Sequence, residues 1–309
     1  MKFILRRVLG LFPILFLTWT AVFIVFESIP GDPVTLMLAG VPASEEVIAN
    51  ERARLGLDKP VLERYVTFLG RAATGDLGES YRTREPVTRM IMDQVRPTLE
   101  LAAGGLVVGL SMGLLLGLLA GLRPNTWVDT TATFTALAGS SLPSFFTGMV
   151  MIYVFGSILG WVPIVGRGFD ALILPAISTG LFIAGDFARL VRSSIIDASR
   201  QDYIRTARAK GLPPIKVIGK HALRNALIPP VTVLGISIST LIGGAVVTEN
   251  VFARPGLGTM LVQGVLNKDM PLIQALVVYT TATYLLINLI VDILYGMIDP
   301  RIRHERAMG

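Results

Sequence analysis

The side chains that could do chemistry in this sequence are gathered in one stretch, residues 201–230, which reads QDYIRTARAKGLPPIKVIGKHALRNALIPP. Between residues 189 and 227 there are nine Lys or Arg residues and only two acids. Lys216, Lys220 and Arg224 follow one another at intervals of four, which places three cations on one face of a helix. This pattern indicates a surface that presents shape and charge to a partner, not a set of groups for covalent catalysis.

Catalytic and metal-binding motifs are missing from the sequence. Its two histidines, His221 and His304, both lie in basic segments, and it contains no cysteine. There is no HExxH, GxSxG or GxxxxGK[ST] motif, so neither metal-assisted hydrolysis, a serine nucleophile nor nucleotide binding is indicated. We therefore predict no catalytic residue, no metal site and no cofactor in this chain. If ATP drives the protein, another chain binds it.

Four ionisable side chains lie within apolar runs: Glu27, Glu100, Asp186 and Asp292. Each needs a reason, because a charge at the centre of a bilayer costs about 2.5–3.5 kcal/mol on insertion scales. We expect Glu27 and Glu100 to lie at the outer ends of spans, where water reaches them. Asp186 is one helical turn before Arg189 and can pair with it. So sparse a set argues against a proton-coupled carrier.

The composition places these residues in a membrane protein. Hydrophobic residues make up 52% of the 309 residues and charged residues 16%, which is too apolar for an ordinary soluble protein. The net charge of +6 comes from segments that flank apolar runs, so it does not indicate nucleic-acid binding. The apolar runs predict six spans, near residues 8–29, 98–122, 130–159 with a break at Pro143, 172–189, 227–247 and 272–298.

The charge balance of the loops predicts their sides. Residues 30–97 carry nine basic and ten acidic residues, in contrast to the basic stretch, and excess Lys and Arg is typical of cytoplasmic loops. We expect a periplasmic loop ordered by helices at Glu45–Leu55 and Val61–Ala73, with both chain termini cytoplasmic. The predicted organisation is a tail and first span at 1–29, a periplasmic loop at 30–97, a five-helix core at 98–300 that includes a cytoplasmic loop at 190–226, and a cytoplasmic tail at 301–309.

Small residues recur at every fourth position in two of the predicted spans. They are Gly105, Gly109, Gly113, Gly117 and Gly121 in the second span, and Gly235, Ser239 and Gly243 in the fifth. A helix in lipid forms despite its glycines, because its backbone groups have no other partner. The glycines then leave a groove that another helix can approach closely. In the fifth span the same face could instead line a pore, and both interpretations stay open.

The basic stretch has a predicted structure of its own. Its first helix, from Gln201, ends at Gly211, a residue that suits the left-handed position just past a helix. Pro213 and Pro214 then begin a second helix that runs to Ala226. We expect a short helix–turn–helix that lies beneath the membrane, with Ile215, Ile218, Ala222 and Ala226 on a face apart from the three cations.

The text YIRTARAKG followed by HALRNALIP resembles the EAA loop of binding-protein-dependent ABC transporter permeases, in the dipeptide, oligopeptide and glutathione branch. When the sequence is aligned on Gly211, Arg205 and Thr206 stand where the general pattern has Glu and the first Ala. With these replacements the text is similar to that of the peptide branch. PGDP at 30–33, LGLDKP at 55–60 and GDLGESYRTREPV at 75–87 are similar to the same branch. The resemblance covers nearly the whole chain.

The resemblance implies an all-α polytopic membrane protein with six transmembrane helices, a cytoplasmic coupling-helix loop and a helical periplasmic loop after the first span. Its implied function is the permease subunit of an ATP-driven importer, which forms half of the pathway for peptides across the bacterial inner membrane by alternating access. The implied partners are a second homologous permease, two cytoplasmic ATPases that hold ATP and Mg, a periplasmic substrate-binding protein and membrane lipid. The residues implied to couple to the ATPase are Asp202, Tyr203, Arg205, Thr206, Ala207, Lys210, Gly211, Lys216, Lys220, His221, Arg224 and Asn225.

Three other functions stay open. A self-sufficient secondary transporter would need coupling-ion ligands and often an inverted repeat, and the sequence has no convincing repeat. A permease for nickel complexes would resemble the peptide branch. A structural or assembly protein would use the basic stretch as a lipid-binding surface.

Overall fold

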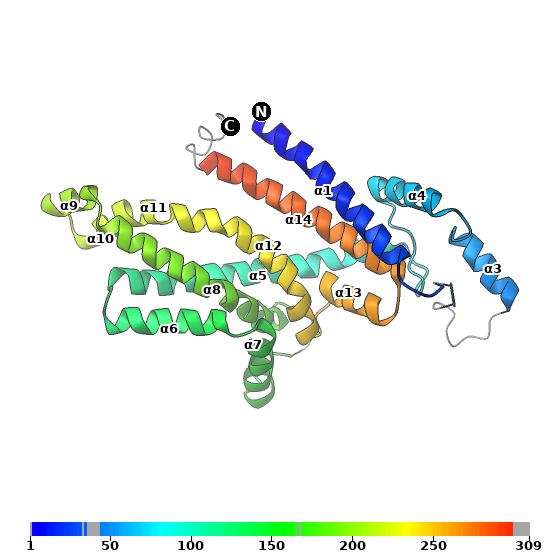
Figure 1. Ribbon diagram of the computed structural model, residues 1–309. Coiled ribbons are helices and arrows are strands. Elements are labelled where there is room, and N and C mark those ends of the chain that lie inside the picture. Colours follow the sequence, from blue (N-terminus) through cyan, green and yellow to red (C-terminus); the bar gives the residue numbers. More distant parts are fainter. Residues whose placement is uncertain (1, 33, 36–43, 165, 167, 299–309) are drawn as a thin grey trace. The chain divides into compact units, whose positions relative to one another are not determined.

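The structure, a computed structural model, describes residues 2–32, 34, 35, 44–164, 166 and 168–298 (Figure 1). The side chains at 2–6, 214, 231–237, 239, 240, 242, 292 and 294–298 lie outside this description. Asp292, which the sequence predicts to fix helix packing near the inner end of the sixth span, and the predicted tail at 301–309 therefore fall on parts that it does not cover. By contact the chain divides into two compact units, and each is described by itself. Unit 1 holds the chain up to Arg96 together with Gly256–Ile293, and unit 2 holds Pro97–Pro255 and the chain from Leu294.

The described residues form helices and no β-strand, so the predicted all-α class is confirmed. The elements are α1 (Lys2–Glu27), α3 (Glu45–Arg54), α4 (Val61–Thr74), α5 (Val87–Leu122), α6 (Trp127–Ser141), α7 (Ser144–Met151), the π-helix η1 (Ile152–Ile158), α8 (Asp170–Ser199), α9 (Asp202–Ala209), α10 (Pro214–Lys216), the π-helix η2 (Val217–Ala222), α11 (Leu223–Ala226), α12 (Ile228–Val251), α13 (Leu257–Leu266) and α14 (Met270–Ile298).

Several of these helices are long and apolar enough to cross a membrane. In the part of the chain that the structure describes there are four, within α1, α5, α8 and α14, or up to five if the bent pair of α6 with α7 and η1 counts as one span. α12 has 24 residues but is not among them, so the number six stays a prediction.

The predicted break at Pro143 is confirmed. α6 and the helical segment from Ser144 are bent against each other by 101°. Leu142, between them, has the extended conformation (φ −85°, ψ 133°) that a following proline favours. Pro143 then stands directly before α7, where its missing N–H costs no helical hydrogen bond.

Unit 1 explains why α5 begins at Val87 and not at Thr98, where the apolar run starts. Val87 and Ile91, one helical turn apart, are fully buried against Leu257 and Met260 of α13 and Leu272 of α14. The first turns of α5 therefore belong to a core that no local pattern reveals. Pro97 lies inside the helix, which continues past it.

A polar clasp joins the segment before α5 to the turn between α13 and α14. The buried carboxylate of Asp269 accepts hydrogen bonds from the Ser80 hydroxyl at 2.5 Å and from the backbone N–H of Tyr81 at 3.1 Å. Burial raises the pKa of the Tyr81 phenol to about 12, and the charge of Asp269 adds to this shift. The clasp holds residues 78–86 against α13 and α14 within unit 1.

The two helices expected in the periplasmic loop are present as α3 and α4. Ser44 caps α3, since its hydroxyl accepts the backbone N–H of Val47. α4 ends at Gly75, whose φ of 78° is the left-handed conformation that glycine adopts without strain.

Unit 2 is organised around α8, a helix of 30 residues. α8 packs against α6, α7 and α12, and along its length it contacts α5 (Figure 1). The predicted fourth span ended near Arg189, but α8 continues to Ser199, well inside the stretch predicted as loop. Val191, Ile195 and Ala198 explain the continuation, because they keep an apolar face that is buried.

Candidate functional site

The turn at Gly211 shapes the basic loop. Gly211 has φ +74°, as the sequence predicts. Its N–H donates to the carbonyl of Arg208 at 2.9 Å, and the N–H of Leu212 donates to the carbonyl of Ala207 at 3.3 Å. These two bonds form a Schellman motif, which satisfies the last carbonyls of α9 and fixes the direction in which the chain leaves it. An added Cβ at Gly211 would meet no atom within 4 Å, so the constraint on this position is conformational.

The second half of the loop corrects the prediction of a regular helix. Residues 217–222 form the π-helix η2, and the face on which side chains lie therefore shifts. Ala222 and Ala226 are buried as expected, but Val217 takes the place predicted for Ile215. Ile215 is 84% exposed.

A hydrophobic floor joins the loop to the end of α8. Ile204 of α9 and Val217 of η2 are fully buried in a cluster with Val191 and Ile195 of α8. Ala207, one of the residues implied to couple to an ATPase, is buried in the same cluster, so it supports the loop from beneath. The loop is thus attached to the longest helix of unit 2.

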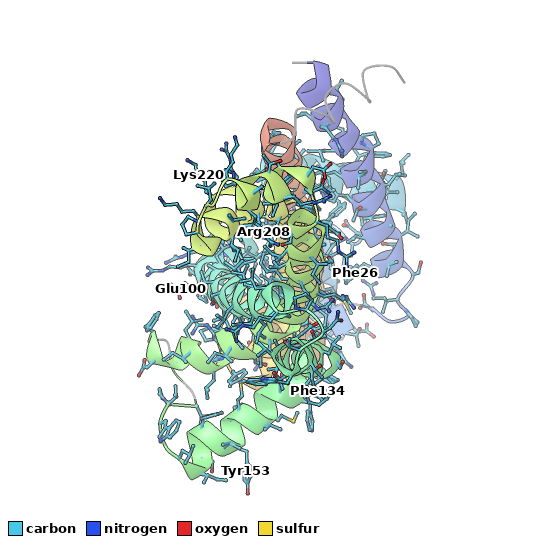
Figure 2. All side chains as sticks on the ribbon, turned by 90° about the vertical axis from the view of Figure 1, so that its left-hand side faces the viewer. Phe26, Glu100, Phe134, Tyr153, Arg208 and Lys220 are labelled. Atoms are coloured by element: carbon cyan, nitrogen blue, oxygen red, sulfur yellow. The ribbon has the colours of Figure 1, made fainter. Side chains whose placement is uncertain are left out.

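The opposite face of the loop is cationic and exposed. Of the residues singled out from the sequence, most lie on it, and His221 is partly buried. The exposed ones are Asp202, Tyr203, Arg205, Thr206, Lys210, Gly211, Lys216, Lys220, Arg224 and Asn225. Figure 2 shows the side chain of Lys220 pointing outward from the loop. Ile215, Leu212 and Tyr203 add exposed apolar groups, so this face combines positive charge with apolar anchors.

The glycines of the second span lie against α8 at close range. A Cβ added at Gly109, Gly113 or Gly117 would stand 2.9, 2.9 or 2.6 Å from a backbone carbonyl oxygen of α8. Gly105 and Gly121, at the two ends of the series, face Thr179 and Ile195 at 3.2 and 3.0 Å. The two backbones therefore touch at successive turns, and a side chain at these positions has no room.

The small residues of the fifth span lie in α12, and the structure does not bring them to a described helix contact. A Cβ at Gly243 would meet nothing within 4 Å, and Gly243 is exposed. Gly235 and Ser239 lie where the side chains are outside the described part. The choice between pore lining and packing for this face therefore stays open.

A bidentate ion pair that the sequence analysis missed connects α6 to α8. Arg192 donates from Nε to Oδ1 of Asp129 at 2.6 Å and from a terminal nitrogen to Oδ2 at 2.7 Å. Asp129 is buried, and it also accepts the backbone N–H of Asn125 at 2.9 Å. This pair fixes the turn after α5 to the part of α8 that carries the basic loop. Its one sequence signal is an acid three residues after Thr126, the N-cap of α6.

A second missed cluster lies where α12 ends, within unit 2. Glu249 has no exposed surface and accepts the Thr98 hydroxyl of α5 at 2.6 Å. Arg254, which is buried, pairs with Glu100 of α5 at 3.0 Å. Glu249 escaped notice because the apolar run ends at Val247, so the residues after it read as loop. The cluster holds the C-terminal end of α12 to α5.

The structure also shows where Asp186 and Glu27, two of the acids predicted to lie within spans, are placed. Asp186 pairs with Arg189 at 2.5 Å, as expected from their spacing, and both side chains are exposed. Glu27 was expected at the end of the first span where water reaches it; it is the exposed last residue of α1, and it pairs with Arg64 of α4. Both interactions tie charged groups together at helix surfaces.

Helices long and apolar enough to cross a membrane, together with an exposed basic loop packed on the end of α8, define a multi-pass membrane protein. The chain belongs to the family of the binding-protein-dependent transport system inner membrane component, whose model matches residues 113–304. The model for the N-terminal part of these membrane components matches residues 1–102. The protein is therefore a permease subunit of an ABC importer.

Curated relatives agree with this assignment. The chain is 40% identical over 306 residues to the glutathione transport system permease protein GsiC of Escherichia coli strain K12, with 99% of this chain and all of that protein covered. The same identity and coverage hold for GsiC of Shigella flexneri serotype 5b (strain 8401).

Solved structures show the same fold. An inward-facing conformation of the MetNI methionine ABC transporter matches with a TM-score of 0.60 and 22% identity, over 70% of this chain and 99% of that chain. An amino acid ABC transporter solved with histidines matches with a TM-score of 0.53 and 16% identity, over 69% of this chain and 94% of that chain.

Proposed function

We propose that this subunit forms half of the translocation pathway for glutathione or small peptides and works by alternating access. Its substrate class rests on the 40% identity, over 99% of the chain, to permeases named for glutathione transport. In the proposed complex it pairs with a second homologous permease, receives substrate from a periplasmic binding protein and docks two ATPases that hold ATP and Mg. It contributes no catalytic group of its own.

The observation that carries the coupling role is the exposed cationic face of the basic loop on its buried floor. Positive charge beside apolar anchors suits a groove of an ATPase that is acidic at its rim and apolar within. Because the loop is packed onto α8, a force on α9 reaches the spans through side-chain contacts already in place. We propose that the loop faces the cytoplasm and residues 30–97 the periplasm, with the termini on the cytoplasmic side.

The turn at Gly211 offers the test of this role. In Gly211→Val a β-branched residue must adopt positive φ, which costs about 1–3 kcal/mol locally and redirects α9. We expect the complex to insert and assemble but to lose substrate-stimulated ATP hydrolysis in liposomes. Gly219→Val is the matched control, because Gly219 lies in the same loop, is exposed and has no positive φ.

Two results would contradict the assignment. Native coupling in Gly211→Val would remove the docking role of the turn. If the loop only held anionic lipid, Lys216→Glu with Lys220→Glu would loosen the loop from the membrane surface, while Gly211→Val would leave ATP hydrolysis coupled. The substrate class is tested by adding glutathione or dipeptides as competitors during substrate uptake by the importer. Uptake that neither competitor reduces would refute the proposal.

A further inference from the structure

Helix α4 lies against the last turns of α1 within unit 1. The hydroxyls of Tyr65 and Thr20 are 2.7 Å apart. The ring of Phe23 lies 5.2 Å from that of Tyr65 and 5.7 Å from that of Phe68. Arg64 pairs with Glu27 at the C-terminal end of α1. Three kinds of contact therefore fix α4 to α1. They are the ion pair at Glu27, the aromatic contacts at Phe23, and the hydroxyl contact at Thr20.

These contacts set the depth of α4. The spanning part of α1 is Arg7–Glu27, 21 residues, and at 1.5 Å per residue it is about as long as the hydrocarbon core of a bilayer is thick. Glu27 therefore marks one boundary of that core. Thr20 lies seven residues before it, about 10 Å inside the boundary along the helix axis. α4 is thus held beside the part of α1 that passes through the outermost ~10 Å of the hydrocarbon core.

Only part of the apolar face of α4 is covered by α1. Leu62, Val66, Leu69 and Ala73 follow at spacings of four, three and four, which puts them on one face of the helix. Leu62 is 73% exposed and Val66 61%. On the other side of the helix lie Glu63, Thr67 and Thr74, which are exposed and polar. α4 therefore has three sides. One packs against α1, the next is an exposed apolar stripe, and the third is polar.

The neighbouring surface of α1 identifies what covers this stripe. Ile24 and Val25, at the levels that α4 contacts, are exposed apolar residues of a helix that crosses the membrane. Lys59 before α4 and Arg71 in its last turn are exposed, and they pair with Glu63 and Asp76. Exposed apolar groups of α4 that lie beside the exposed apolar groups of a spanning helix match the acyl chains of lipid.

We propose that α4 is an interfacial membrane helix. It lies in the leaflet at the C-terminal end of α1, with Leu62, Val66, Leu69 and Ala73 against acyl chains and with Glu63 and Thr67 toward water. The segment from residue 44 to residue 86 is then attached to the bilayer at α4 as well as to its own unit.

The lack of cysteine in the chain allows a direct test. Single-cysteine variants Leu62→Cys and Val66→Cys carry a nitroxide in the full importer, reconstituted in vesicles of phosphatidylethanolamine and phosphatidylglycerol. Glu63→Cys and Thr67→Cys are matched controls, because they lie on the same helix and are exposed on its other side. Collision rates with molecular oxygen, which concentrates in lipid, and with a water-soluble nickel chelate are measured at each site.

At positions 62 and 66 we expect the ratio of oxygen to nickel collisions to be several-fold higher than at 63 and 67. Equal ratios at all four sites would place α4 in water and overturn the proposal. Low collision rates with both reagents at 62 and 66 would mean that protein covers the stripe, such as the second permease, and would overturn it as well. Native uptake by each variant shows that labelling leaves the importer folded.

Discussion

The contact between α5 and α8 predicts that a single added methyl group will separate two helices. At Gly117 a Cβ would stand 2.6 Å from the backbone oxygen of Ala188 and 2.7 Å from the Cβ of Val191. Ordinary van der Waals contact begins at 3.4 Å, so the helices must part locally by about 0.8 Å. Val191 is fully buried and the oxygen belongs to a helix backbone, so neither group can turn aside.

Two opposing terms decide the size of the effect in Gly117→Ala. In water, Ala favours a helix over Gly by about 1 kcal/mol, but a helix in lipid has no unfolded backbone to compete with. Overpacking a tight contact costs about 1–3 kcal/mol, and this term dominates. At roughly 2–4 °C per kcal/mol, we expect the melting temperature to fall by about 2–12 °C.

The assay is thermal unfolding of the purified chain in detergent, followed by intrinsic tryptophan fluorescence. Gly109→Ala and Gly113→Ala, with carbonyl oxygens at 2.9 Å, should destabilise the chain less than Gly117→Ala. Gly243→Ala is the control, since its Cβ would meet no atom within 4 Å. A melting temperature of Gly117→Ala equal to that of Gly243→Ala would refute the reasoning.

Two further predictions concern the ion pair at α6 and the orientation of the chain. Asp129→Asn should lower the stability by about 1–3 kcal/mol, because it leaves the partly buried Arg192 without its bidentate partner. A double-mutant cycle with Arg192→Gln measures the coupling, and additive effects would show that the pair contributes nothing. Reporter fusions at Asp76 and Lys210 should report opposite compartments, because residues 30–97 are nearly neutral and the basic loop is not. The same compartment for both would exclude the proposed orientation.

Local signals in the sequence predicted the elements that depend on local chemistry. The positive φ of Gly211 and the break before Pro143 follow from the backbone limits of those residue types. α3 and α4 follow from helical spacing between turn residues. The series of glycines at every fourth position indicated a close helix contact, although not that α8 would supply it.

The features that the sequence did not reveal depend on residues far apart in the chain. Asp129 and Arg192 are 63 positions apart, and nothing in either segment indicates the other. Val87 extends α5 because of a core formed with α13 and α14. No local pattern indicated the π-helix at residues 217–222, and Ile215, expected on the apolar face, is exposed while Val217 is buried against α8.

The glycine contact between α5 and α8 also limits how unit 2 can deform. Helices that touch through side chains can slide as those side chains change rotamer, but at Gly109, Gly113 and Gly117 the contact is between backbones. Sliding would bring α8 carbonyls against larger residues until the next glycine, four residues or about 6 Å further on. The contact therefore resists sliding of α5 along α8, and we expect a push on the basic loop to tilt both helices together. The bending needed for a change of state must then fall elsewhere, and the 101° break at Pro143 is where the helical run is already interrupted.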